Sequence, residues 1–431
     1  MVPIRAPLSS AARLVNWLIQ FCSLPSLSGN PFFKLGRYAT AIVDESELTE
    51  MLAPNQSFST TSKLTQTDGG EVRTLQSGDI ASVAELFQMT FRSPRRRAPT
   101  SLADYLRSLF LHHPWQCDDI RSLVFIDNAG ELKGFIGVLP VQLHHHGKSL
   151  RAAVMGSLMA KNPEENPLVG ARLVRAALRG GQDISLSESA NPLSQRMWEL
   201  AGGRTLPLFS MTWLRIFRPI AVPIAFLAAG PRLQRICTSL VSPLDAVLSR
   251  FDSNPFSRPL SAAADCDVPS SIDEFIGAVP ALVSHYAVRP DWDPATLRWQ
   301  LLNASTKEKF GDLKCRFVRK GNRTVGGFLY YSRPGGIGFV LQIFAEPEHE
   351  FAVVASLLAR AASDGCVAMR GRTQPELLDP LIRSKALLFQ RSSTVVHAKD
   401  RDLTQSLRLG DALITGLAAE TWTRLIGGEF V

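Results

Sequence analysis

Hydrophobic and polar positions follow regular patterns along the chain, and the period changes repeatedly between that of a strand and that of a helix. The alternating stretch 71–76 predicts a short strand, and the apolar-periodic run over 80–91 predicts a helix behind it. A second helix is predicted over 101–113. A hairpin pattern follows, with strands in RSLVFID and KGFIGVLPVQL, and then the strand LRAAVMGSLMA.

A loop and four further elements complete this first series. The loop EENPLVG leads into the helix ARLVRAALRG, and ISLSES, 184–189, predicts the next strand. The helix ANPLSQRMWELAGG ends at a glycine pair, as helices commonly do. We expect the strand FSMTWLRIF, 209–217, to close the unit.

The same order of elements recurs in the second half of the chain. Two helical patterns are followed by a hairpin pattern in CRFVRKGNRTVGGFLYYS, the strand IGFVLQIFAE, the helix EHEFAVVASLLARAASDG and the strand CVAMRGR. A duplicated α/β unit explains this recurrence at a spacing of about 190 residues.

The length of 431 residues also favours at least two domains. We expect an N-terminal amphipathic segment with a polar linker over 1–70, a first domain over 71–215, a linker over 216–267, and a second domain with a C-terminal tail over 268–431. The apolar part of the linker, RPIAVPIAFLAAGP, contains three prolines and is too short to cross a bilayer.

Composition narrows the class of protein. A hydrophobic content of 45% with 20% charged residues is typical of a folded globular protein. The net charge of +8 favours anionic partners such as phosphate groups or a membrane surface. The six cysteines include no CxxC pair, which argues against a disulfide framework and against a metal site, and favours a reducing compartment.

The N-terminal segment predicts an amphipathic helix. Residues 1–43 contain no Asp or Glu, and LVNWLIQFCSL, 14–24, carries its polar residues at helical spacing. Such a helix packs on the protein or lies on a membrane surface. We therefore expect a cytoplasmic protein, a monomer or a dimer, and leave open a peripheral contact with the inner face of a membrane through 1–30 or 216–250.

The order of predicted elements resembles the GNAT N-acyltransferase family, here in tandem over 72–215 and 268–400. The resemblance implies an α/β (α+β) fold of two GNAT-like units, each a mixed, mostly antiparallel sheet flanked by helices. It also implies transfer of an acyl group from acyl-CoA, either acetyl-CoA or a longer homologue, to an amine. The acceptor would be a small molecule or glycan that resembles an amino sugar or an amino acid.

In this family an (R/Q)xxGx(G/A) loop binds the pyrophosphate of acyl-CoA through backbone N–H groups at a helix N-terminus. Within EENPLVG, Glu165 stands where Arg or Gln is usual, Leu168 replaces the first glycine, and Gly170 matches the second. The resemblance assigns acyl-CoA binding to the following residues: Leu158, Met159, Leu168, Val169, Gly170 and Ala171.

The catalytic residues that the resemblance implies are incomplete. Trp198 stands where the family commonly has a Tyr that protonates the leaving thiolate, and an indole N–H does not do this work. Ser194, one helical turn earlier, is the candidate to orient a water or donate a hydrogen bond. Glu188 is the candidate general base if burial raises its pKa; otherwise it is a surface or helix-capping carboxylate. If catalysis depends mainly on positioning the two reactants, it requires neither the Ser194 hydroxyl nor a general base.

Two other functions stay open. A Fem-type aminoacyl or peptidyl transferase would explain the altered loop and the basic charge, although the chain shows no coiled-coil arm. A catalytically inactive GNAT-like binding protein would explain Trp198. The second unit, whose loop EPEHEFAVV has three Glu and no glycine, is interpreted as a structural and acceptor-shaping half.

The run Arg95, Arg96 and Arg97 lies between the first two helices. It is either a solvated loop or a site that recognises an anionic acceptor or the 3′-phosphate of CoA. Nucleic-acid binding would require aromatic residues among the basic ones, and none occur there, so nucleic acid is not expected as a partner.

Overall fold

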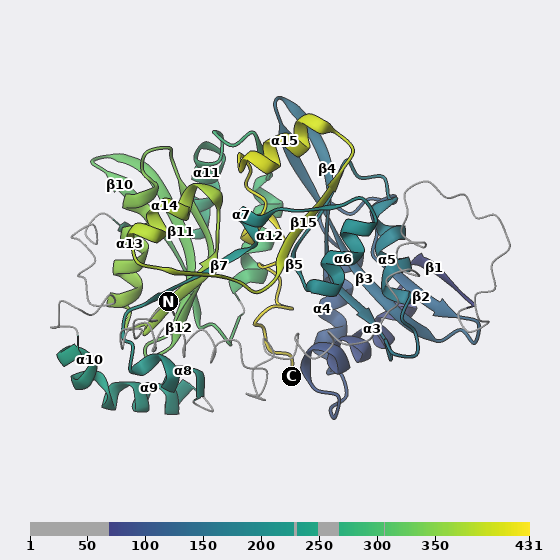
Figure 1. Cartoon of the computed structure of the whole chain (residues 1–431), viewed down its shortest axis with the longest axis horizontal. Helices are drawn as coiled ribbons and strands as arrows, with labels where there is room; N and C mark the ends of the chain where they lie inside the picture. The colour runs from purple at the N-terminus through teal and green to yellow at the C-terminus, as the bar shows by residue number, and fades with distance from the viewer. Residues whose placement is uncertain (1–68, 228–230, 249–266, 306) are drawn as a thin grey trace, which may run out of the picture.

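The computed structural model describes residues 69–431 except for 228–230, 249–266 and 306. Within them the chain forms two sheets side by side, each with helices packed against it (Figure 1). Each sheet combines one parallel pair of named strands with antiparallel pairs. This confirms the predicted α/β (α+β) class, with two mixed, mostly antiparallel sheets. The helix expected in 1–43 lies outside the described residues.

The first sheet has the strand order β1-β2-β3-β4-β5-β15-β6, with the short β9 paired to β3. Its strands are β1 (Gly70–Thr74), β2 (Leu123–Asp127), β3 (Leu132–His145), β4 (Lys148–Ala160), β5 (Ile184–Ala190), β6 (Arg204–Thr205), β9 (Val288–Pro290) and β15 (Ser393–Ala398). Side chains of α3 (Ile80–Phe87) and α4 (Thr100–Leu111) enter one hydrophobic core of this sheet, and those of α5 (Val169–Leu178) and α6 (Pro192–Leu200) enter another. A π-helical turn, η3 (Gln88–Arg92), continues α3.

The second sheet has the order β14-β7-β13-β12-β11-β10-β8. Its strands are β7 (Met211–Ile216), β8 (Asp267–Pro269), β10 (Asp312–Lys320), β11 (Arg323–Ser332), β12 (Ile337–Ala345), β13 (Ala368–Arg372) and β14 (Leu387–Gln390). The helices around it are α11 (Ile272–Leu282), α12 (Pro294–Ser305), α13 (Glu350–Ser363) and α14 (Leu378–Arg383). Short helical turns also occur: η2 (Ser77–Asp79), α7 (Pro207–Ser210), η5 (Pro375–Leu377) and η6 (Gly416–Ala418).

The two units exchange one strand each, which corrects the expectation that FSMTWLRIF closes the first unit. That stretch forms β7, which pairs with β13 and β14 in the second sheet. In return, β15 pairs with β5 and β6 in the first sheet, where its yellow arrow crosses to the other half of the molecule (Figure 1). A local pattern predicts that a segment is a strand but not which sheet it joins, because pairing depends on distant partners.

The two units also share their largest hydrophobic core. It contains Leu86 and Leu106 from the helices of the first unit together with Phe275 and Leu301 from those of the second. Trp422, near the C-terminus, is buried in the same core. The halves are therefore joined by packed side chains as well as by the connecting chain.

The connection between the units contains three helices, α8 (Ala221–Leu227), α9 (Pro231–Leu240) and α10 (Ser242–Leu248). Ala221 and Val222 of α8 pack against Ile216 and Ala368 in the second sheet. No helix in the described ranges is both long enough and apolar enough to span a membrane.

Candidate active site

Strands β4 and β5 run parallel only briefly and then separate. Their pairing joins Ala152–Val154 to Ile184–Leu186 and goes no further. A β-bulge follows in β4 at Ser157, whose φ is 54°. Because the two strands do not pair beyond this point, the backbone groups on their facing edges are available to a ligand. The strands therefore form an open cleft.

The cleft opens into a cavity of about 730 Å³ that lies between the two sheets. Its walls come from β3, β4, β5 and the start of α6 in the first unit, and from β7, β12, β13 and β14 in the second. The third wall is the C-terminal segment, residues 411–431, which runs between the two halves (Figure 1). A volume of this size is typical of small-molecule sites.

Glu420 of the C-terminal segment lies in the cleft. Its Oε1 accepts a hydrogen bond from the hydroxyl of Ser189 at 2.6 Å, and its Oε2 accepts one from the backbone N–H of Glu188 at 3.3 Å. Across the cleft, a Cβ added to Gly156 would come within 3.7 Å of the Glu420 side chain. A carboxylate that the sequence analysis did not single out thus lies between β4 and β5.

Glu188, the predicted general base, is buried beside it and also lines the cavity. Its Oε2 accepts a hydrogen bond from the N–H of Gly416 at 2.8 Å, and its Oε1 accepts one from the N–H of Thr421 at 2.8 Å and another from the Thr421 hydroxyl. Both carboxylate oxygens therefore bind the C-terminal segment. A catalytic role for Glu188 stays a prediction, and its contacts show that it anchors this segment.

Burial governs the protonation of these groups. It raises the pKa of Glu420 to about 8, with a smaller contribution from the nearby Glu188 carboxylate. It also raises the pKa of Glu188, against the opposing charge of Arg372. Lys307, whose ammonium donates to the carbonyl oxygen of Thr421, has its pKa lowered by burial to about 7. The cleft thus holds two carboxyl groups with raised pKa values, of which that of Glu420 is about 8.

The start of α6 borders the cavity, but the predicted Ser194 is not among the lining residues. Asn191 caps the helix, because its Oδ1 accepts the N–H of Ser194 at 2.8 Å. Asn191 itself lines the cavity, together with Pro192 and Leu193. Trp198 is buried in the core between α5 and the sheet, so it is a packing residue in the structure.

The loop before α5 is the candidate pyrophosphate site. The N–H groups of Glu165 and Asn166 both donate to the carbonyl oxygen of Asn162, at 2.9 and 3.0 Å, and are thereby occupied. Pro163 and Pro167 have no N–H. At the start of the helix, the N–H groups of three predicted cofactor-binding residues donate no hydrogen bond within the described part of the chain: Leu168, Gly170 and Ala171. Gly170 and Ala171 are buried and Leu168 is half-buried, so Leu168 is the one of these three residues that reaches the surface.

The other predicted cofactor residues have packing contacts. Met159 is buried in the core with α3 and α4, whereas Leu158 packs against the core with α5. Val169 is buried in that second core as well. Gly170 also lies inside the protein, where an added Cβ would come within 3.3 Å of the methyl group of Met197 on α6. The absence of a side chain at Gly170 therefore serves helix packing.

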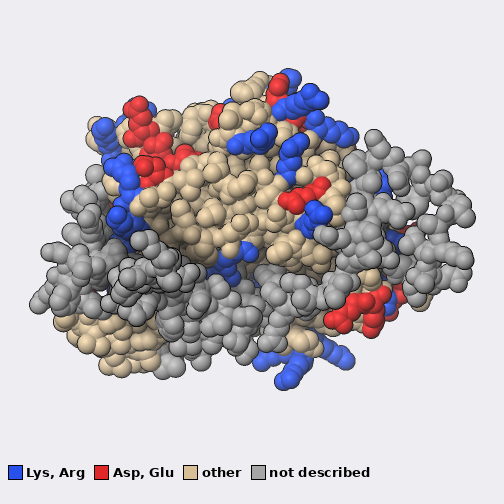
Figure 2. Space-filling model, in the orientation of Figure 1, with Lys and Arg blue, Asp and Glu red and all other residues tan. Residues whose placement is uncertain are grey.

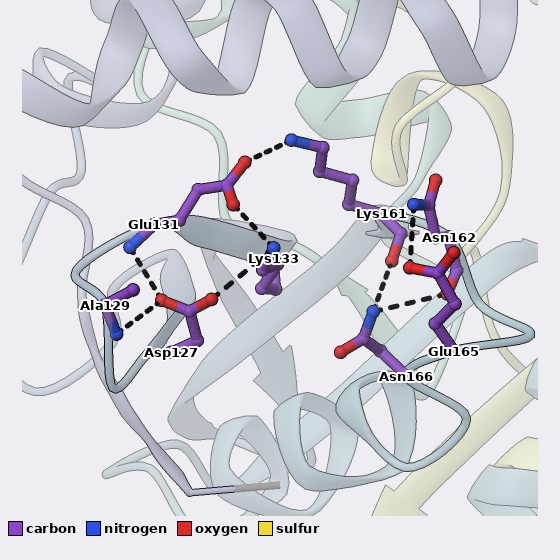
Figure 3. Close-up of polar contacts among 8 residues, drawn as sticks. All are labelled: Asp127, Ala129, Glu131, Lys133, Lys161, Asn162, Glu165 and Asn166. Carbon is purple, nitrogen blue, oxygen red and sulfur yellow. Dashed lines mark hydrogen bonds and ion pairs between the residues drawn. The ribbon is translucent and has the colours of Figure 1, made fainter. Parts of the chain in front are cut away.

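The charges around this loop do not favour an anion uniformly. Glu131 in the β2–β3 turn forms ion pairs with Lys133, at 2.6 Å, and with Lys161 (Figure 3). Asp127 lies within 3.4 Å of the same Lys133 (Figure 3). Glu165 is exposed and accepts a hydrogen bond from the Asn162 side chain at 2.9 Å (Figure 3). The lysines nearest the loop are thus already paired with carboxylates.

The corresponding cleft of the second unit is filled by protein. Strands β12 and β13 pair over Ile337–Phe339 and then separate, as β4 and β5 do. The amide of Gln342 donates to Gln374 at 3.0 Å, and its Oε1 accepts the N–H of Leu417 at 2.9 Å. Gly416 fits against β12 only because it has no side chain, and its φ of 66° suits glycine. The open cleft is the one in the first unit.

Five basic residues that the sequence analysis missed line the cavity among the described residues, namely Arg92, Lys309, Arg370, Arg372 and Arg391. Arg370 and Arg372 alternate along β13, a pattern in CVAMRGR that could have indicated a basic strand face. By contrast, the predicted run of Arg95, Arg96 and Arg97 is exposed and does not line the cavity. On the face in Figure 2, basic side chains lie in separate groups among acidic ones. The described residues contain no cluster of His, Cys, Asp and Glu that could hold a metal ion.

Comparison with known proteins identifies the fold. A conserved protein of unknown function from Enterococcus faecalis V583, described as a probable N-acyltransferase, has a TM-score of 0.50 at 9% identity over 76% of this chain and 72% of that one. GCN5-related N-acetyltransferases from Kribbella flavida and Anabaena variabilis ATCC 29413 have TM-scores of 0.48, at 13% and 10% identity. They cover 78% and 77% of this chain, and 72% and 73% of their own.

No family model and no curated protein matches the sequence. At these identities the structural likeness establishes the fold alone. The chain shares the fold of the Enterococcus faecalis protein, and its two mixed sheets agree with the tandem arrangement that the order of elements predicted.

Proposed function

We propose that this protein is an N-acyltransferase that transfers an acyl group from acyl-CoA to an amine in the cleft between β4 and β5. The observation that carries the proposal is the cleft itself, which is open in the first unit and continues into a cavity large enough for two reacting groups. The N–H group of the half-buried Leu168, which donates no hydrogen bond within the described residues, supports a phosphate-binding role at the end of β4.

The reaction needs little beyond positioning and one proton acceptor. The amine nitrogen attacks the thioester carbonyl carbon, the C–S bond breaks as the amide bond forms, and the thiolate takes up a proton to leave as CoA. Holding both reactants in one cavity supplies most of the rate. We assign the general base to Glu420, because its carboxylate has a raised pKa and lies in the cleft. Glu188 then positions the segment that carries it.

The test is to incubate the full chain with acyl-CoA of several chain lengths and a panel of amines, following thiol release and the mass of the N-acylated product. Calorimetry with CoA runs beside it. Product formation supports the proposal. Absence of both product and CoA binding overturns it.

One observation favours the inactive binding protein as a second candidate. Glu165 is exposed in the loop where a pyrophosphate would lie, and the nearest lysines are paired with Glu131. CoA binding without turnover of any amine would favour this candidate. A Fem-type transferase would instead consume aminoacyl-tRNA and leave acyl-CoA intact.

A further inference from the structure

Three basic side chains from distant parts of the sequence line the same cavity. Arg92 comes from η3 in the first unit, Lys309 from the loop between α12 and β10, and Arg370 from β13. Neither half of the chain therefore supplies this group of cations alone.

Backbone contacts place the cations around one part of the C-terminal segment. Arg92 donates to the carbonyl oxygens of Gly428, at 2.9 Å, and Leu425, at 3.2 Å. The backbone N–H of Lys309 donates to the carbonyl oxygen of Gly427 at 3.1 Å. The Arg370 guanidinium lies 5.9 Å from the ring centre of Phe310, the next residue after Lys309.

The Lys309 ammonium has no direct hydrogen-bond or ion-pair partner among the described residues. Burial and the charge of Arg92 lower its pKa, against the opposing charge of Glu429. Glu308 and Glu429 act on Arg92 electrostatically, but neither lines the cavity. Among the described lining residues, five are Lys or Arg and two are Glu. The charge of the cavity lining as a whole therefore favours an anion.

The remaining walls are largely apolar. They include aromatic side chains from both units, namely Phe87, Phe91, Phe110, Phe339 and Phe389. Such walls bind an apolar body, whereas an amino sugar would need partners for several hydroxyl groups. Arg370 and Arg372 lie on the same face of β13, about 7 Å apart along the strand. Arg372 donates to the carbonyl oxygen of Glu188, so β13 connects the cation group with the carboxylates of the cleft.

We infer that the acceptor is an apolar amino carboxylate, whose carboxylate is bound by Arg92, Lys309 and Arg370 and whose amine lies toward Glu420. This inference rests on the proposed function and selects the amino-acid-like acceptor over the amino sugar. Carboxylate recognition by clustered Arg and Lys uses charge-assisted hydrogen bonds, which are the strong ones.

The first experiment measures binding without turnover. The full chain is titrated calorimetrically with N-hexanoyl-phenylalanine, a product-like probe, and with its primary amide, which lacks the charge. We expect the acid to bind about tenfold more tightly than the amide. Lys309→Met should remove that preference, whereas Lys320→Met, at an exposed position on β10, should retain it.

Three results would overturn the inference: equal affinity for acid and amide, binding of neither probe, or a preference that survives Lys309→Met. A fourth result would also overturn it, by showing that the anion bound by these cations belongs to CoA. If Lys309→Met weakens CoA binding about tenfold, the cations recognise the phosphates of CoA and not an acceptor.

A thiol-release assay separates this inference from the proposed function. Turnover of phenylalanine in preference to phenethylamine, lost in Lys309→Met through a rise in KM, supports both. Turnover of glucosamine or phenethylamine with no preference for the carboxylate keeps the acyltransferase and overturns the acceptor. No thiol release with any amine overturns the proposed function, and the binding experiment still decides what the cavity recognises.

Discussion

At the scale of single residues, two neighbouring carboxylates have different surroundings. Glu188 could be selected from the sequence because it ends a predicted strand next to a predicted cleft. Glu420 could not, because it is a lone acidic residue in an apolar stretch far along the chain. Only the fold shows that the Glu188 carboxylate accepts hydrogen bonds from two backbone N–H groups, whereas the Glu420 carboxylate lies between β4 and β5.

These surroundings predict a pH dependence. A base acts in its ionised form, and the pKa of Glu420 is raised to about 8. We expect kcat/KM for the amine to rise with pH through about 8 and then to level off, after correction for ionisation of the amine itself. Glu420→Gln should retain the hydrogen bond from Ser189, lower kcat about a hundredfold and abolish that part of the profile. The measurement is the pH profile of both proteins with one amine.

Glu188→Ala is the control variant for Glu420→Gln. It leaves the buried N–H group of Gly416 and the half-buried N–H group of Thr421 without acceptors, so thermal denaturation should show a loss of about 2 kcal/mol in unfolding free energy. If Glu188→Ala kept the parent's stability and lost the pH-dependent step, Glu188 would be the base and Glu420 would not.

At the scale of elements, the local patterns predicted most helices and strands, including the strands that form the two parallel pairs and the helix between the members of each pair. The bulge at Ser157 and the cavity were beyond prediction, because each depends on how separate elements pack. The loop before α5 could be predicted only in part. Its position was predicted, but its internal hydrogen bonds around Asn162 and the paired lysines were not visible in the sequence.

We predict that removing a negative charge from this loop increases the affinity of the protein for CoA. Glu165 is exposed in the loop that leads to Leu168, whose N–H group donates no hydrogen bond within the described residues, so replacing the charge of Glu165 should weaken repulsion of a pyrophosphate. We expect Glu165→Arg to bind CoA about fivefold more tightly at low salt, with a smaller gain at high salt. Asp312→Arg, an equal change of charge on β10, is the control. Calorimetric affinities that are identical for Glu165→Arg and the parent would place the phosphates elsewhere.

At the scale of the whole molecule, the two units are interlocked. Although the repeat in the sequence predicted two similar units, it also suggested that each would be complete in itself. The structure places β7 between β14 and β13 of the second sheet, and β15 between β5 and β6 of the first. The C-terminal segment then forms one wall of the cavity between the two sheets and fills the cleft of the second unit.

This interlocking predicts how the protein responds to a cut between the units. A protease site inserted within 249–266 would leave β7 on the first fragment and β15 on the second, so each sheet would contain one strand from the other fragment. Withdrawal of a strand would replace its interstrand hydrogen bonds with bonds to water, at a net cost of about 0.5–1.5 kcal/mol each, and would divide the shared core. We expect the cut protein to elute as one species and to melt in one transition, and each fragment expressed alone to be unfolded or aggregated. Elution as two folded fragments under native conditions would contradict the exchange of strands, and with it a cavity built from both units.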